Sequence, residues 1–246
     1  MIRRTLGYAL VATAVTLSMV ACGSEPETRA PDPTTANLLS STEAPSAGRD
    51  GPGAPTRPMN LDELGYTLGD PDAPVRLIEF SDFGCGYCRQ FHEEVWPTLE
   101  QEYVETGKVF WKYVPMILGI FPNAMDAAQA GECAAEQGRF RDMQDRLFAA
   151  QREWKGSDQA EDVLVSIATD LGLDVPRWRA CIQDGTRDDR IAAGTQLSQQ
   201  AGVRGTPTFF VVGYAPIPGA LPLELFREVL DTAYAAAMRG DGPGGL

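Results

Sequence analysis

Short runs of apolar residues stand out at three widely separated places in an otherwise mixed sequence. The first run lies between Val75 and Phe80, and the other two cover residues 109–114 and 208–212. A short apolar run of this kind fits a strand that is buried on both faces of a sheet. The pattern therefore predicts three strands, with long segments of chain between them.

The segments around these strands have helical periodicity, with an apolar residue every three or four positions. Residues 122–200 show this spacing, and residues 223–238 form a final amphipathic helix. A further helix is expected at about residues 85–106, where Pro97 should kink it or end its first part. Strands that alternate with helices predict an α/β fold, with a helical insertion at about 122–200.

The first part of the chain, residues 1–21, has the features of a signal peptide. Two arginines precede an apolar run at residues 6–20, and the small residue Ala21 ends it. The run is short for a stable transmembrane helix. Cys22 follows directly, and this junction resembles a bacterial lipoprotein cleavage site, so we expect Cys22 to carry lipid. An ordinary signal peptide or an uncleaved anchor, with an incidental cysteine, is the alternative.

Residues 22–58 form a low-complexity segment rich in Pro, Ser, Thr, Ala and Gly. Such a composition buries too little apolar surface to fold, so we expect a disordered tether. The folded domain is predicted at residues 59–240, and residues 241–246 are expected to form a loose tail. With a lipid on Cys22, the tether would hold the domain clear of a membrane.

The composition is that of a folded domain with an acidic surface. Of the 246 residues, 43% are hydrophobic, which supports a core of ordinary size, and the formal net charge is −13 at pH 7. An acidic chain repels the phosphate backbone, so nucleic acid is excluded as a partner. The 5 cysteines of a chain with an export signal predict disulfides.

Cys85 and Cys88 form a Cys-x-x-Cys pair just after the first predicted strand. Three positions apart on a helix, their sulfurs lie on one face and can close a disulfide. The unpaired N–H groups and the dipole at a helix N-terminus favour an anion, so we expect Cys85 to be an exposed thiol with a low pKa. A thiolate is the nucleophile of disulfide exchange, and Cys88 is placed to resolve the mixed disulfide.

A Cys-x-x-Cys pair taken alone is also half of a zinc site. Zinc would need two further ligands, and the remaining candidates are His92, Cys133 and Cys181. None of these forms a second close pair, so the sequence predicts no metal.

Three stretches carry a family resemblance when they are taken together. They are residues 68–74 (Leu-Gly-Asp-Pro-Asp-Ala-Pro), 78–83 (Ile-Glu-Phe-Ser-Asp-Phe) with the cysteine pair after them, and 205–210 (Gly-Thr-Pro-Thr-Phe-Phe). Over residues 64–238 the chain resembles the DsbA-like thiol–disulfide oxidoreductases of the thioredoxin superfamily. The resemblance implies a thioredoxin-like α/β fold with a helical insertion.

The resemblance also implies roles for residues outside the cysteine pair. Glu79 stands where the superfamily has a buried acid that assists proton transfer at the second cysteine; a strand-end acid that reaches solvent is the alternative. Thr206 and Pro207 stand where a cis-proline loop pairs with a substrate strand, and a trans turn proline is the alternative. His92, the single histidine, is expected in a packing or surface role.

Cys133 and Cys181 both fall in the predicted helical insertion. The resemblance implies a structural disulfide between them, because some DsbA-like proteins have one in this region. Two free buried thiols are the alternative. Closing this loop would stabilise the fold by at most about 4 kcal/mol.

The resulting hypothesis is an exported, membrane-tethered enzyme that oxidises cysteine pairs in secreted or cell-envelope proteins through Cys85 and Cys88. Its substrates would be unfolded or reduced exported proteins, and its redox partner would be a quinone-linked thiol oxidase in the membrane. No cofactor is expected beyond the redox-active disulfide. An isomerase or reductase of the same fold, and a redox-inert binding lipoprotein, are the alternatives.

Overall fold

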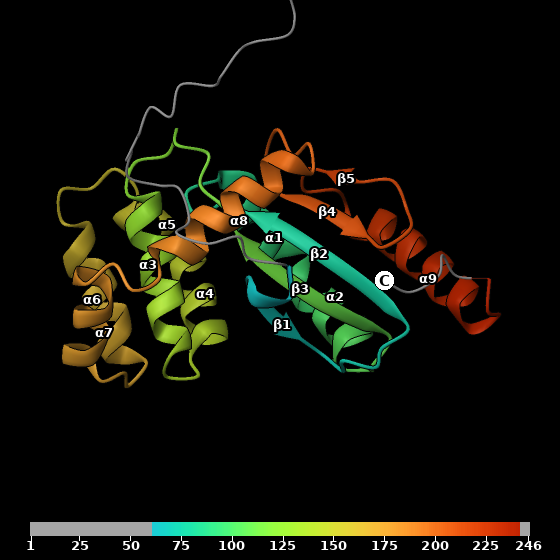
Figure 1. Ribbon diagram of the computed structural model, residues 1–246, viewed down its shortest axis with the longest axis horizontal. Coiled ribbons are helices and arrows are strands. Elements are labelled where there is room, and N and C mark those ends of the chain that lie inside the picture. The colour runs from blue at the N-terminus through green and yellow to red at the C-terminus, as the bar shows by residue number, and fades with distance from the viewer. Residues whose placement is uncertain (1–60, 242–246) are drawn as a thin grey trace, which may run out of the picture. The chain divides into compact units, whose positions relative to one another are not determined.

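The computed structural model describes residues 61–241, in which helices surround a central sheet (Figure 1). The strands of this sheet are β1 (Tyr66–Leu68), β2 (Val75–Ser81), β3 (Val109–Pro115), β4 (Thr208–Val211) and β5 (Ile217–Pro218). They lie in the order β1-β3-β2-β4-β5. β2 and β3 run parallel, and the other neighbours are antiparallel. The three predicted strands are therefore confirmed, and they form the centre of the sheet.

The helices fall into three groups along the chain (Figure 1). Two follow β2, five form an insertion beside the sheet, and the last two return to the sheet. Their bounds are α1 (Gly86–Glu94), α2 (Trp96–Leu99), α3 (Ala124–Ala135), α4 (Phe140–Ala149), α5 (Gln151–Trp154), α6 (Ala160–Asp170), α7 (Val175–Gln183), α8 (Asp188–Gln200) and α9 (Leu223–Met238). The predicted α/β fold with a helical insertion is confirmed.

β2 packs against an apolar cluster on each of its faces, although Arg76 is exposed and Ile78 is only partly buried. Leu77 on one face belongs to the apolar cluster that contains Phe91 of α1 and Phe226 of α9. Phe80 on the other face belongs to a separate cluster with Ala193 of α8. Successive side chains of a strand point to opposite faces, so β2 anchors a core on each side of the sheet.

The helix that follows β2 is broken at the position where proline predicts a break. α1 ends at Val95, and α2 begins directly after it with Pro97 in its first turn. Proline has no N–H to donate, so it fits the first turn of a helix and not the interior. A π-helical turn at Glu100–Val104 completes the segment. The first part of the helix carries the cysteine pair and is separate from the rest.

The two edge strands are not predicted by the apolar pattern. β1 has three residues. β5 has only two residues, one of them Pro218, and it lies where the sequence pattern suggests a turn. Strands this short have no readable alternation, and proline is accepted at sheet edges. Tertiary pairing with β3 and β4 creates both of them.

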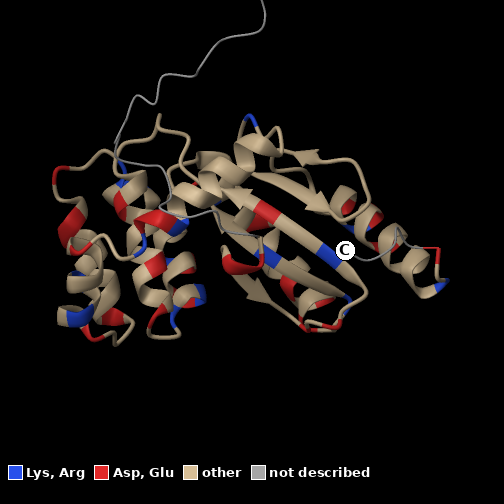
Figure 2. Ribbon diagram, viewed as in Figure 1, with Lys and Arg blue, Asp and Glu red and all other residues tan. Residues whose placement is uncertain are grey.

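Charged side chains gather on the helices, while the strands carry few of them (Figure 2). Within residues 61–241, no helix combines the length and the apolar character needed to cross a membrane.

Candidate active site

Cys85 occupies the N-cap position of α1, at the end of the turn that leaves β2. The turn closes on Asp82, whose carbonyl accepts the N–H of Cys85 at 2.9 Å. Cys88 lies in the first turn of α1, and both cysteines are free thiols. The structure therefore brings the two predicted redox cysteines together at a helix N-terminus.

Both thiols are buried, which corrects the prediction that Cys85 is exposed. Cys85 is 4% exposed and Cys88 is fully buried. The loop before β4 lies over the first cysteine, and Sγ of Cys85 donates a hydrogen bond to the carbonyl of Thr206 at 3.2 Å. Cys85 still lines an open groove, so it is the more accessible sulfur of the two.

Their surroundings separate the pKa values of the two thiols. Hydrogen bonding with the Cys88 thiol, helped by the Thr206 hydroxyl and the N–H groups of Tyr87 and Cys88, lowers the pKa of Cys85 to about 6 against the effect of burial. Burial raises the pKa of Cys88 well above its ordinary value. At neutral pH, Cys85 is therefore the thiolate and Cys88 keeps its proton.

Thr206 and Pro207 are joined by a cis peptide bond directly before β4. Because β4 pairs with β2, this loop lies beside the turn that carries Cys85. Oγ1 of Thr206 is buried and has no hydrogen-bond partner among the described residues. It can donate to a Cys85 thiolate without giving up another bond.

Glu79 is fully buried in the middle of β2 and does not reach solvent. Its Oε1 lies 2.9 Å from Nε2 of His92, and its Oε2 accepts a hydrogen bond from Nε1 of Trp111 at 3.1 Å. Burial raises the pKa of the neighbouring Tyr113, and the charges of Glu79 and Cys88 raise it further. Glu79 pairs with Tyr113 across β2 and β3, and Cys88 belongs to the same buried apolar cluster as Tyr113.

His92 belongs to this site, although the sequence suggests only packing or a surface position. Its ring is buried and stacks on Phe148 of α4, with 4.4 Å between the ring centroids. A buried carboxylate needs hydrogen-bond partners, and His92 supplies one of the two that Glu79 has. A signal was present in the sequence, because His92 lies four residues after Cys88 and shares its helix face.

A second buried acid, Asp82, accepts hydrogen bonds at the turn between β2 and α1 (residues 82–85, here called the redox turn). Its two carboxylate oxygens accept the N–H groups of Gly84 and Leu118, each at 2.8 Å. Burial raises the pKa of Asp82, and the two hydrogen bonds oppose that shift. Gly84 has no room for a side chain, since a Cβ there would lie 2.4 Å from Cβ of Phe121. The redox turn and the loop after β3 are therefore in direct contact.

A groove of about 430 Å³ runs beside Cys85 and along the first turns of α1. Tyr87 lines it and is 67% exposed. The other residues that line it are Gly86, Arg89, Gln90, Glu94 and Phe121. The groove offers apolar and charged contacts next to the reactive sulfur.

Cys133 of α3 and Cys181 of α7 form a disulfide, with their Cα atoms 5.9 Å apart. Both are buried in the apolar cluster of the insertion, together with Leu164 and Trp178. The bond ties two helices of the insertion to each other.

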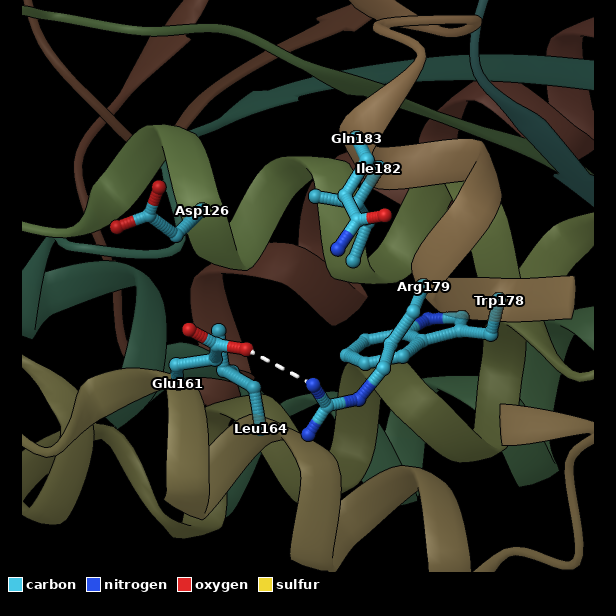
Figure 3. Close-up of a pocket in the computed structure, with 7 residues that line it drawn as sticks. All are labelled: Asp126, Glu161, Leu164, Trp178, Arg179, Ile182 and Gln183. Carbon is cyan, nitrogen blue, oxygen red and sulfur yellow. Dashed lines mark hydrogen bonds and ion pairs between the residues drawn. The ribbon is translucent and has the colours of Figure 1, made fainter. Parts of the chain in front are cut away.

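A second cavity, of about 260 Å³, lies between α3, α6 and α7 (Figure 3). Glu161 and Arg179 form an ion pair of 3.2 Å across it, beside the indole of Trp178. None of the predicted site residues lines this cavity. The candidate redox chemistry therefore belongs to the groove at Cys85.

The predicted targeting segments lie in a part of the chain that the structure does not describe. Cys22, the predicted signal peptide 1–21 and the tether 22–58 all lie outside the described residues.

Within residues 61–241, no three His, Cys, Asp or Glu side chains are grouped so that they could hold a metal ion.

Known proteins match this chain over most of the described residues. The family model described as thioredoxin matches residues 62–232. A curated relative from Salinispora tropica, named "Na(+)/H(+) antiporter NhaA 3", is 36% identical over 178 residues, which is 72% of this chain but 26% of that protein. The chain spans about a quarter of the length of the antiporter relatives it matches.

A second relative and a solved structure carry names from disulfide chemistry. "Probable disulfide bond formation protein D" from Bacillus cereus is 28% identical over 151 residues, or 60% of this chain and 69% of that protein. The crystal structure of a cysteine-to-alanine variant of α-DsbA1 from Wolbachia pipientis has a TM-score of 0.65 and 25% sequence identity. The match covers 71% of this chain and 92% of that chain.

Proposed function

Because this chain belongs to the thioredoxin family, as a DsbA-like member, we propose that it is a thiol–disulfide oxidoreductase that oxidises cysteine pairs in exported proteins. The observation that carries the proposal is the position of Cys85, at the start of α1 beside Cys88 and the carbonyl of Thr206. A cysteine in this position has a stabilised thiolate and a second thiol within reach, and disulfide exchange requires both.

Oxidation of a substrate would begin from the Cys85–Cys88 disulfide. A substrate thiolate attacks Sγ of Cys85, a mixed disulfide forms, and Cys88 leaves as a thiolate. The second substrate thiolate then attacks the substrate sulfur of the mixed disulfide, which closes the substrate disulfide and releases Cys85. Two electrons pass from the substrate to the protein, which ends as a dithiol.

Glu79 is proposed to manage the proton at Cys88. Cys88 must take up a proton after it leaves, because burial raises the pKa of its thiol well above the ordinary value. Glu79 is buried on β2 opposite Tyr113, which shares an apolar cluster with Cys88, and its hydrogen bonds to His92 and Trp111 hold it in place. A positioned carboxyl group of this kind can accept and return a proton during the reaction.

The pKa values of the two thiols support the oxidising direction. A stabilised Cys85 thiolate lowers the free energy of the reduced form, which makes the disulfide form a stronger oxidant. The pKa of about 6 for Cys85 lies between about 7 for thioredoxin and about 3.5 for DsbA. We therefore propose an oxidant of intermediate strength, with isomerisation as a secondary activity.

Thr206 and Pro207 are proposed to hold the substrate chain. The sulfur of Cys85 lies 3.2 Å from the carbonyl of Thr206, so a substrate strand paired with this loop would bring its own cysteine to the reactive sulfur. Tyr87, which is exposed, and Phe121 line the groove and add apolar contacts suited to unfolded segments.

The proposed place of action is the cell envelope, where disulfides form and persist. A lipid on Cys22 would tether the domain to the membrane, and a quinone-linked thiol oxidase there would take back the two electrons. A Cys22→Ala protein should then lose its partition into membranes. If it partitions like the wild type, the lipid anchor is wrong.

The direction of the reaction can be tested with three substrates. Oxidised protein in stoichiometric amount should restore the disulfides of a reduced, denatured substrate. The reduced protein, whose Cys85 thiolate can attack a disulfide, should act more slowly on a substrate with scrambled disulfides and should not reduce a substrate with native disulfides. Faster rescue of the scrambled substrate would favour an isomerase, and reduction of the native one would favour a reductase.

A further inference from the structure

Gln151 reaches from the helical insertion to the redox turn. Its Nε2 donates a hydrogen bond to the carbonyl of Phe83 at 2.6 Å and another to the carbonyl of Cys85 at 2.9 Å. The residue lies at the start of α5 and is 4% exposed. An amide nitrogen carries two donor hydrogens, so both are used on the turn that holds the reactive cysteine.

These two bonds complete the hydrogen bonding of the turn. The carboxylate of Asp82 accepts the N–H group of Gly84 in the turn. Gln151 donates to two carbonyls of the same turn. The carbonyl of Cys85 also accepts the N–H of Arg89, which is the first bond of the helix. Without Gln151 the carbonyl of Phe83 would lose this donor, and the carbonyl of Cys85 would keep only the bond from Arg89. A buried carbonyl left without a donor is costly, so the turn depends on Gln151.

We propose that Gln151 is a positioning residue of the redox site: by fixing the carbonyls of Phe83 and Cys85, it holds the start of α1 in place around the Cys85 sulfur. The role rests on the proposed disulfide exchange. It gives the helical insertion a direct part in that reaction, besides covering the sheet.

The position of the turn matters because the donors that stabilise the thiolate are themselves part of it. The N–H groups of Tyr87 and Cys88 act on the Cys85 sulfur from the first turn of α1. A change in the peptide plane after Cys85 would move these groups away from the sulfur. The reduced form would then lose stability relative to the disulfide form, which would become the weaker oxidant.

The chain offers a matched control in Gln144 of α4. Gln144 is buried to a similar degree, at 1% exposure. Neither polar atom of its amide has a hydrogen-bond partner among the described residues. Gln144→Met therefore removes a buried amide from the insertion without removing a bond to the redox turn.

The test measures the equilibrium of the full-length protein with glutathione. Oxidised glutathione takes two electrons and two protons from the thiols of Cys85 and Cys88, which gives two molecules of reduced glutathione and the protein disulfide. Gln151→Met should shift the equilibrium constant about tenfold toward the protein disulfide, since a hydrogen bond to the charged Cys85 thiolate is weakened in the reduced form alone. Alkylation of Cys85 should also require a higher pH, and Gln144→Met should change neither result.

Gln151→Asn is the second variant, in case Gln151→Met does not fold. It keeps the amide but is one methylene too short to reach both carbonyls, so it should shift the equilibrium in the same direction. A folded variant at position 151 with the wild-type equilibrium and alkylation profile would overturn the positioning role, as would an equal shift in Gln144→Met. If the wild type does not exchange with glutathione at all, the proposed function fails instead.

Discussion

Two buried cysteine pairs in this protein differ in their chemistry. Cys85 and Cys88 are free thiols at the start of α1, close together in sequence. Cys133 and Cys181 are bonded to each other between α3 and α7, 48 positions apart in sequence. Burial is common to both pairs, so it cannot be what makes one pair reactive.

The groups around the sulfurs account for the difference. Cys85 has the N–H groups of a helix start and the hydroxyl of Thr206 beside it, and these favour a thiolate. Cys133 and Cys181 are instead bonded to each other, so neither carries a thiol that could ionise. The contrast predicts one pair that exchanges disulfides and one that only stabilises the fold.

The largest expected effect comes from Cys85→Ser, which should abolish oxidation of a reduced substrate. Without the Cys85 sulfur, neither the redox disulfide nor the mixed disulfide can form. Recovery of substrate disulfides, followed by gel-shift alkylation, measures this. The double variant Cys133→Ala/Cys181→Ala is the control and should keep the activity; if it were inactive and Cys85→Ser active, the assignment of the two pairs would be reversed.

The same double variant should lose stability. Removal of the disulfide gives back chain entropy to the unfolded state, which lowers the free energy of unfolding by up to about 4 kcal/mol. Urea unfolding followed by circular dichroism measures the change. An unfolding midpoint equal to that of the wild type would mean that the insertion does not depend on this bond, and two free thiols in the purified wild type would show that it does not form.

Glu79→Gln should slow the formation of the mixed disulfide, the step in which Cys88 leaves, by about 100-fold, within the range of general acid–base effects. The amide preserves the shape of the side chain but cannot take up a proton in the same way. Stopped-flow measurement of the mixed disulfide gives the rate. Alkylation of Cys85 is the control, because it does not involve Cys88 release, and a wild-type exchange rate would remove Glu79 from the mechanism.

The smallest expected effect concerns the pH dependence of the reduced form. The pKa of Cys85 is lowered to about 6, so its ionised thiol stabilises the folded dithiol above that pH, and this contribution is lost as the pH falls through about 6. The stability of the reduced protein relative to the oxidised one should therefore rise between pH 6 and pH 8. Parallel urea titrations of both forms test this, and Cys85→Ser should show no such rise.

Structural features that depend on a single segment of the chain could be predicted from the sequence. The strand before Cys85, the break at Pro97 and the final helix all leave a local pattern of apolar residues or of backbone chemistry, and each lies where that pattern predicts. The edge strands β1 and β5 leave no such pattern, because only their partners in the sheet make them strands.

The same distinction separates the parts of the site. Cys85, Cys88 and the Thr206–Pro207 loop belong to motifs that can be read along the chain. Asp82 belongs to the stretch before the cysteines, but its contact with Leu118 is far away in sequence. Gln151 acts on the redox turn from a distant segment. No spacing rule connects Gln151 to the cysteines, so only the folded structure identifies it.

The reduction potential of the Cys85–Cys88 couple tests the central claim most directly. It can be measured against glutathione buffers, with the double variant Cys133→Ala/Cys181→Ala used to leave only one titrating pair. A stabilised Cys85 thiolate predicts a potential clearly above that of thioredoxin, which is about −270 mV, and below that of DsbA, which is about −120 mV. A potential at or below the thioredoxin value would contradict an oxidising role and would make a reductase the better account.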